Sequence, residues 1–343
     1  MSGRREEEGG ELRNHQRLFV VGASAGGVQA LQGLAAALPA DFAAPLLVVL
    51  HVGSHPSILP ELLRAAGPLP ARHAVQGQGL QKGCITVAPP DHHMLVIGDR
   101  IELTRGPKEH HARPAIDPLF LSAALSQGPG VVGVILTGML DDGTAGLQAV
   151  KQAGGAAVVQ NPDDALAPSM PLSALKHVEV DHCVSLAQLP KLLCSLATRP
   201  VTGGPNRPLP ALQHELSITL TTGNAMEHLH ALGATPSTFV CPDCHGDLWE
   251  IGHSRPPRYR CHTGHAFTLR TLQHALSTAT DDAVWNALRA LQEKALVQQR
   301  MARLHREAGE TELAEQMELA AKAADEQAAV LRNLVEHIPE PVE

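Results

Sequence analysis

Residues 17 to about 195 alternate short apolar runs with helical patterns, and this alternation constrains the fold more than any other feature. The runs typical of buried strands are 17–23, 45–51, 84–88, 131–137, 155–159 and 182–184. Apolar residues recur at helical spacing near 26–38, 58–65, 117–127, 143–153, 168–175 and 187–196. Apolar strands separated by helices are typical of a parallel sheet covered on both faces. We therefore predict a doubly wound, mostly parallel sheet in three layers (α/β/α) over residues 17–196, interrupted by a β-hairpin around Gly98-Asp99.

A serine stands in the turn between the first predicted strand and its helix. The turn reads Gly22-Ala23-Ser24-Ala25-Gly26, a G-x-S-x-G pattern that can present a nucleophilic hydroxyl at the carboxyl edge of a sheet. The pattern also arises by chance in chains rich in alanine and glycine. A glycine turn here would also suit a dinucleotide site, but that site needs an acidic residue after the second strand, where this chain has His51.

Two further strand ends carry groups that could activate this serine. His51 ends the second predicted strand, and Asp141-Asp142 follow the strand at 131–137. A serine hydroxyl needs an imidazole as base and a carboxylate to orient that imidazole. The chain holds 20 histidines, and His55 and His73 lie near enough to compete with His51. Spacing does not choose between the two aspartates, either of which could instead cap the following helix.

The first 195 residues resemble the catalytic domain of the chemotaxis receptor methylesterases, the CheB family. The matching runs include Val-Val-Gly-Ala-Ser-Ala-Gly-Gly, Val-Leu-His, Val-Ala-Pro-Pro-Asp-His-His and Arg-Pro-Ala-Ile-Asp, in that order along the chain. Leu-Thr-Gly-Met-Leu-Asp-Asp-Gly follows, and then Gln-Asn-Pro with Pro-Ser-Met-Pro. The resemblance implies that Ser24 is the nucleophile, His51 the base and Asp142 the acid, with the backbone N–H of Met139 in the oxyanion hole.

The same resemblance implies an activity and a partner. A family member demethylates glutamate γ-methyl esters, and also deamidates glutamine, on the cytoplasmic helical region of methyl-accepting chemotaxis receptors. Two alternatives stay open: a hydrolase of the same fold with another acyl substrate, and a signalling adaptor with a vestigial site. This chain departs from the family at Ala25, where threonine is usual, and at Leu140-Asp141, where glycine and asparagine are frequent.

Charge and hydropathy exclude several classes of protein. The net charge of −8 argues against nucleic-acid binding. No apolar run approaches the roughly 20 residues that a membrane span requires. The polar tail over residues 1–16 lacks the apolar core of a signal peptide, so we expect a cytoplasmic protein. Those 16 residues are too few for the receiver domain usual in the family, so we expect an enzyme that is constitutive, or regulated by its C-terminal part, or regulated by a separate chain.

A cysteine and histidine cluster predicts a metal site in the C-terminal half. After a linker rich in proline and glycine and an ambiguous stretch, together 197–236, residues 237–270 hold Cys241-Pro-Asp-Cys244 and Cys261-His-Thr-Gly-His265. This is the spacing of a zinc ribbon, with four ligands for a closed, structural zinc site. We assign Cys241, Cys244, Cys261 and His265 as ligands and expect no catalytic cofactor. The alternative ligands are His262, His245 and His253, and the alternative chemistry is a redox C-x-x-C pair.

The last part of the chain has a helical pattern. Residues 278–337 are rich in alanine, leucine, glutamate and glutamine, and Gly309 interrupts them. We predict a two-helix hairpin that begins near Asp281-Asp282, with its second helix capped by Thr311. This hairpin either is exposed to solvent without a partner, or docks on the helices of a receptor or on a second copy of the chain. The remaining cysteines, Cys84, Cys183 and Cys194, lie among apolar residues and are predicted to belong to the core.

Overall fold

The computed structural model describes residues 17–201, 209–220, 225–252 and 254–336. The predicted N-terminal tail, residues 202–208 and 221–224 of the predicted linker region, and His253 lie outside these ranges. The chain divides into two compact units, one ending at Thr271 and the other beginning at Leu272.

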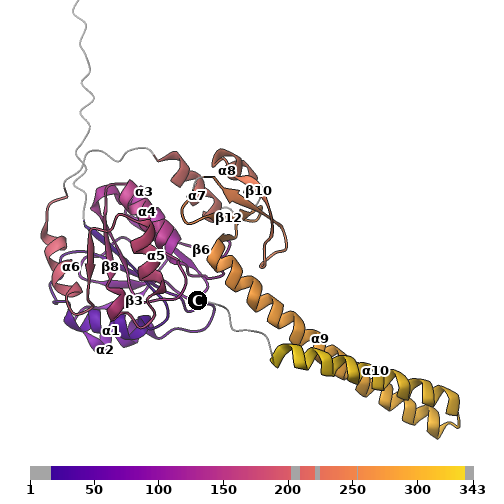
Figure 1. Cartoon of the computed structure of the whole chain (residues 1–343). Coiled ribbons are helices and arrows are strands. Elements are labelled where there is room, and N and C mark those ends of the chain that lie inside the picture. Colours follow the sequence, from indigo (N-terminus) through magenta and orange to yellow (C-terminus); the bar gives the residue numbers. More distant parts are fainter. Residues whose placement is uncertain (1–16, 202–208, 221–224, 253, 337–343) are drawn as a thin grey trace, which may run out of the picture. The chain divides into compact units, whose positions relative to one another are not determined.

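A seven-stranded sheet forms the centre of the first unit (Figure 1), and every pair of neighbouring strands is parallel. Its strand order is β3-β4-β2-β1-β7-β8-β9. The strands are β1 (Leu18–Ala23), β2 (Leu46–Leu50), β3 (Ala71–His73), β4 (Ile85–Val87), β7 (Val131–Ile135), β8 (Ala156–Gln160) and β9 (His182–Val184). The predicted doubly wound α/β fold is confirmed. β3, a three-residue edge strand, was not predicted from the sequence.

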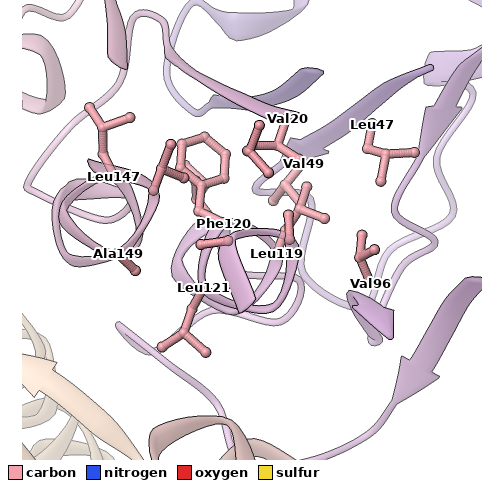
Figure 2. Close-up of a cluster of buried hydrophobic side chains, with 14 of the residues drawn as sticks. Val20, Leu47, Val49, Val96, Leu119, Phe120, Leu121, Leu147 and Ala149 are labelled. Atoms are coloured by element: carbon pink, nitrogen blue, oxygen red, sulfur yellow. The ribbon is translucent and has the colours of Figure 1, made fainter. Parts of the chain in front are cut away.

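Helices cover both faces of this sheet. On one face lie α1 (Gly27–Ala37), α2 (Leu59–Ala66) and α6 (Leu189–Thr198), whose buried side chains share one core cluster. On the other face lie α3 (Ile116–Gln127), α4 (Thr144–Gln152) and α5 (Ser169–His177), which share a second cluster with the hairpin of β5 (His93–Ile97) and β6 (Arg100–Thr104). Figure 2 shows part of this second cluster, with Phe120 beside Val20 and Leu147.

The chain changes direction at the centre of the sheet. From β1 it moves outward through β2 to the edge strand β3, then forms β4 between β2 and β3, and returns to pair β7 with the other side of β1. The loops after β1 and β7 therefore diverge at a topological switch point, where open α/β sheets bind their ligands. The loops after β1, β2 and β7 meet at this carboxyl edge.

A smaller sheet completes the first unit. Helices α7 (Pro210–Leu220) and α8 (Met226–Ala231) precede an antiparallel sheet of β10 (Thr235–Val240), β11 (Asp247–Ile251), β12 (Arg258–Cys261) and β13 (Ala266–Thr268). Both helices fall in the stretch that the sequence left ambiguous.

The second unit is a helical hairpin. Helix α9 (Leu269–Glu307) and helix α10 (Thr311–Glu336) flank Gly309, which has a φ of 79°, as the predicted interruption requires. The predicted start near Asp281 was wrong, because α9 begins at Leu269. There the Thr268 hydroxyl accepts the N–H of Thr271 at 3.1 Å and so caps the helix.

The isolated cysteines differ in burial. Cys84 is buried, as predicted, and Cys194 is half-buried. Cys183 is exposed, so its prediction as a core residue was wrong; it lies on β9, at the edge of the sheet. Among the described residues, no helix is both long and apolar enough to cross a bilayer.

Candidate active site

Ser24 lies in a sharp turn that two glycines make possible. All six residues of β1 are buried, and the chain turns at Gly26, which has a left-handed φ of 75°. A side chain at Gly22 would put its Cβ 2.4 Å from Cγ2 of Ile116, so glycine lets α3 approach β1 closely. The turn leaves Ser24 half-buried at the carboxyl end of the central strand.

His51 and Asp142 complete a line of contacts with this serine. His51 Nδ1 lies 3.1 Å from Ser24 Oγ, and His51 Nε2 lies 2.7 Å from Asp142 Oδ2. The His51 side chain is 21% exposed and that of Asp142 only 2%. The structure thus brings together the three residues predicted for a triad. Asp142 rather than Asp141 faces the imidazole.

Backbone groups hold the Asp142 carboxylate in place. Oδ2 accepts the N–H of Ile116 at 2.7 Å, and Oδ1 accepts those of Asp117 at 3.1 Å and Gly143 at 2.7 Å. Burial alone would raise the pKa of Asp142, but the charge of nearby His110 and the hydrogen bond to His51 outweigh it and hold that pKa well below its usual range. Asp142 is therefore an oriented anion, as a partner of the imidazole must be.

Asp141 has a different environment. It is 4% exposed and accepts a hydrogen bond of 2.8 Å from the Thr268 hydroxyl. Its pKa is raised, chiefly by burial and to a lesser extent by the Asp142 charge. The pKa values of the two neighbouring carboxyl groups are therefore shifted in opposite directions, and burial raises that of Asp141 more than the Asp142 charge does.

Thr137 joins the serine turn to the loop after β7, a role that the sequence did not reveal. Its hydroxyl donates to the carbonyl of Ala25 at 2.9 Å and accepts the N–H of Ala167 at 2.8 Å. Met139 follows in this loop and is 40% exposed. Within the described residues, the N–H groups of Ala25 and Met139 make no hydrogen bond, so both are free to bind an oxyanion.

The predicted metal ligands also converge. The ligand atoms of Cys241, Cys244, Cys261 and His265 all lie within 4.8 Å of one another. Cys244 Sγ is 3.6 Å from Cys261 Sγ, and Cys261 Sγ is 3.5 Å from His265 Nδ1. A tetrahedral zinc with bonds of about 2.3 Å to sulfur and about 2.0 Å to nitrogen separates such ligand pairs by roughly 3.5–3.8 Å. The donor set therefore fits zinc.

Two tight turns present these ligands. In the first, the N–H of His245 bonds the carbonyl of Cys241 at 2.8 Å, and in the second the N–H of Gly264 bonds that of Cys261 at 2.9 Å. All three thiols are free of disulfides. The alternative ligands His245 and His262 are exposed and stand outside the group.

Comparisons with known proteins agree with the fold of the catalytic sheet. The sequence model of the CheB methylesterase family matches residues 19–193. The crystal structure of the Thermotoga maritima CheB methylesterase catalytic domain superposes with a TM-score of 0.51 and 28% identity, covering 53% of this chain and 98% of that domain.

Curated relatives give the same result. A putative protein-glutamate methylesterase/protein-glutamine glutaminase of Leptospira interrogans is 34% identical over 184 residues, which is 52% of this chain and 93% of that protein. Protein-glutamate methylesterase/protein-glutamine glutaminase 3 of Anaeromyxobacter dehalogenans is 43% identical over 161 residues, and the match spans 47% of its length. The chain belongs to the CheB methylesterase family.

Proposed function

We propose that this chain hydrolyses glutamate γ-methyl esters on methyl-accepting chemotaxis receptors and deamidates glutamine by the same route. The observation that carries the proposal is the contact series from Ser24 Oγ through His51 to the buried Asp142. Family membership supplies the substrate class, because the relatives are named for these two activities. The reaction would take place in the cytoplasm, on the receptors' helical region.

Each residue has one task in this reaction. Ser24 attacks the ester carbonyl while His51 takes its proton, and Asp142 holds the imidazole in the required tautomer. The free N–H groups of Ala25 and Met139 stabilise the oxyanion. Protonated His51 then gives its proton to the departing methanol, or to ammonia when the substrate is glutamine. Finally His51 activates the water that hydrolyses the acyl-enzyme and restores Ser24.

The test measures methanol release from the organism's own methylated receptors. Ser24→Ala should abolish release and also abolish labelling by a fluorophosphonate, which reacts only with an activated serine. Ser195→Ala, at an exposed serine on α6, is the matched control and should keep both activities. Full methanol release by Ser24→Ala would overturn the proposal. A wild-type protein that is labelled but releases no methanol would point to another acyl substrate. A wild-type protein that shows neither labelling nor methanol release would point to an adaptor.

We also propose that Cys241, Cys244, Cys261 and His265 hold a structural zinc ion. The spacing of the donor atoms and the two turns support it, and four protein ligands leave no open position for catalysis. Elemental analysis should find one zinc per chain in the wild type and none in Cys241→Ser. Cys183→Ser, at an exposed thiol outside the cluster, should keep the metal. A wild-type protein without zinc would contradict this assignment.

A further inference from the structure

The segment Lys108–His111 lies between the catalytic sheet and the C-terminal part of the first unit. The N–H of Ala266 donates to the carbonyl of Lys108 at 3.2 Å, and the N–H of His110 donates to that of Ala266 at 2.7 Å. Glu109 is 3% exposed; it accepts hydrogen bonds from Arg260 at 3.0 Å and from Thr219 at 2.7 Å. Both partners come from beyond residue 209, so the C-terminal part holds this segment firmly.

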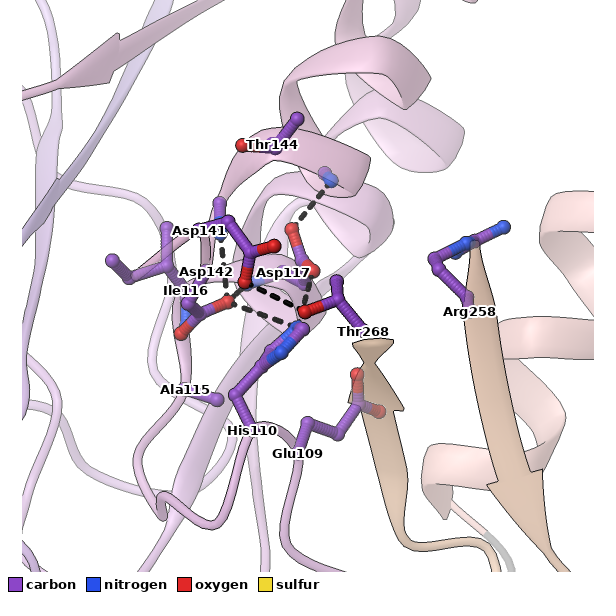
Figure 3. A network of polar contacts seen from close by, with 12 residues as sticks. Glu109, His110, Ala115, Ile116, Asp117, Asp141, Asp142, Thr144, Arg258 and Thr268 are labelled. Atoms are coloured by element: carbon purple, nitrogen blue, oxygen red, sulfur yellow. Dashed lines mark hydrogen bonds and ion pairs between the residues drawn. The ribbon is translucent and has the colours of Figure 1, made fainter. Parts of the chain in front are cut away.

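The held segment aims the His110 ring at the acid of the triad (Figure 3). His110 Nε2 lies 2.8 Å from Asp117 Oδ2 and 3.6 Å from Asp142 Oδ1. His110 Nδ1 lies 3.3 Å from the hydroxyl oxygen of Thr271. The side chain is only 4% exposed. The mechanism above gives this buried ring no task, although it stands behind the carboxylate that orients His51.

The backbone here adopts an unfavourable conformation. His110 and His111 have φ values of 54° and 61°, in the left-handed region. Residues other than glycine rarely adopt this conformation, and such strain persists where the surroundings over-determine the backbone. The pairing with Ala266 is one such restraint, and the buried hydrogen bond of Arg260 to Glu109, at 3.0 Å, is another.

The charges around the ring favour its protonated form. Burial alone would lower the pKa of His110, but the carboxylates of Asp142, Asp117 and Asp141 raise it to about 10. As an imidazolium, the ring donates from both nitrogens, which suits the carboxylate of Asp117 on one side and the hydroxyl of Thr271 on the other.

We infer that His110 is a positioning residue of the esterase, held by the C-terminal part of the chain so that its ring fixes Asp117 and Asp142 behind the triad. Residues 209–271 thereby act as structural support for catalysis. Asp141 adds a second link, since its carboxylate accepts the hydroxyl of Thr268 from β13. The inference rests on the proposed function only for its methanol readout.

The test compares His110→Asn with His111→Asn in the full chain. Asparagine tolerates the left-handed conformation, so both variants keep the backbone. His111 shares the residue type and conformation of His110, but its ring is 55% exposed and faces Asp243 instead of the triad. The readouts are the second-order rate of fluorophosphonate labelling from pH 5.5 to 9 and the kcat and KM of methanol release.

His110→Asn should lower the labelling rate and kcat by about 10- to 100-fold at pH 7, as small displacements of catalytic groups do, with KM unchanged. Its acid limb should also move to higher pH, because an uncompensated Asp142 favours the protonated, inactive triad imidazole. A purely structural role would leave that limb in place. His111→Asn should stay within about twofold of the wild type.

Unchanged rate and pH profile in a folded His110→Asn protein would overturn the inference. If that variant does not fold, Thr271→Val removes the Nδ1 partner while keeping the ring, and it should show a smaller loss of the same kind; wild-type behaviour would then contradict the inference. A wild-type protein that is labelled at Ser24 but releases no methanol would refute the proposed substrate. The labelling rates of the variants would then decide the role of His110.

Discussion

At the scale of single residues, the serine turn has intact geometry but an unusual side chain. The structure brings Ser24, His51 and Asp142 into contact, and the N–H groups of Ala25 and Met139 remain free within the described part of the chain. Ala25 has no hydroxyl where the family usually has threonine. If that hydroxyl binds the oxyanion in relatives, this chain works with one donor fewer.

Ala25→Thr should therefore increase kcat. Ala25 is exposed, so a larger side chain has room. One oxyanion donor is worth about 10²–10³ in rate, and we expect a gain of at least about tenfold in methanol release with KM unchanged. Ala25→Val has nearly the same shape without the hydroxyl and is the control. Equal rates for the two variants would show that the hydroxyl is irrelevant here.

At the scale of elements, the sequence predicted the long strands and helices. It did not predict β3 or the start of α9, which depends on a distant part of the chain. Apolar runs predicted β1, β2 and β7, because strands buried on both faces have few polar residues. β3 reads Ala-Arg-His, with only its alanine buried, so it carries no apolar run, whereas the equally short β4 reads Ile-Thr-Val and is buried throughout. Asp281-Asp282 suggested a helix start, yet Thr268 caps α9 thirteen residues earlier in the chain. Thr268 ends β13, a strand that forms only by pairing within the small sheet.

The sequence also predicted one part of the candidate site and not another. Ser24, His51 and Asp142 stand at strand ends, where chemistry gathers in α/β sheets. Nothing in the sequence distinguished His110 among 20 histidines. Its place depends on Asp117, Thr271 and Asp142, which only the tertiary structure brings around it.

The hairpin of α9 and α10 packs through small side chains. Buried alanines recur at heptad spacing, with Ala295 and Ala302 on α9 and Ala314, Ala321 and Ala328 on α10. Pairs of Gln299 with Asp325 and of Arg306 with Glu318 join the helices in antiparallel register. A seam of alanines lets two helices approach more closely than leucines would.

Enlarging this seam should separate the helices. Ala324 is 1% exposed, and Ala324→Leu should destabilise the hairpin by about 1–3 kcal/mol, as overpacking does. The measurement is thermal unfolding followed by circular dichroism at 222 nm. Ala323→Leu, at the exposed neighbouring position, makes the same chemical change and should have little effect. Equal destabilisation by both would argue against a packed seam.

At the scale of the whole molecule, the buried charges make stability depend on pH. The pKa of His110 is raised to about 10 from 6.5, so its contribution to stability is complete below pH 6.5 and is lost as the pH rises through 10. The pKa of Asp142 is lowered, so its contribution is present above about pH 3.8 and is lost on acidification. Stability should therefore be greatest between these limits.

Calorimetry at several pH values checks this expectation. The wild type should lose more Tm between pH 7 and pH 10 than His110→Asn does, because the variant has no proton to lose at this position. The carboxylates of Asp117, Asp141 and Asp142 and the Glu109–Arg260 pair surround the ring in both proteins. A wild-type curve parallel to that of the variant would contradict the assignment of a buried imidazolium.

The strand order also has a consequence for how the enzyme forms. Ser24, His51 and Asp142 follow three adjacent strands, β1, β2 and β7, yet 27 residues separate the first pair along the chain and 91 the second. Contacts between such distant segments form slowly, because loop closure must precede them. Nucleophilic reactivity at Ser24 should therefore return late in refolding, after bulk helix content, and a reactive-serine probe added at intervals would time the closure of the central sheet.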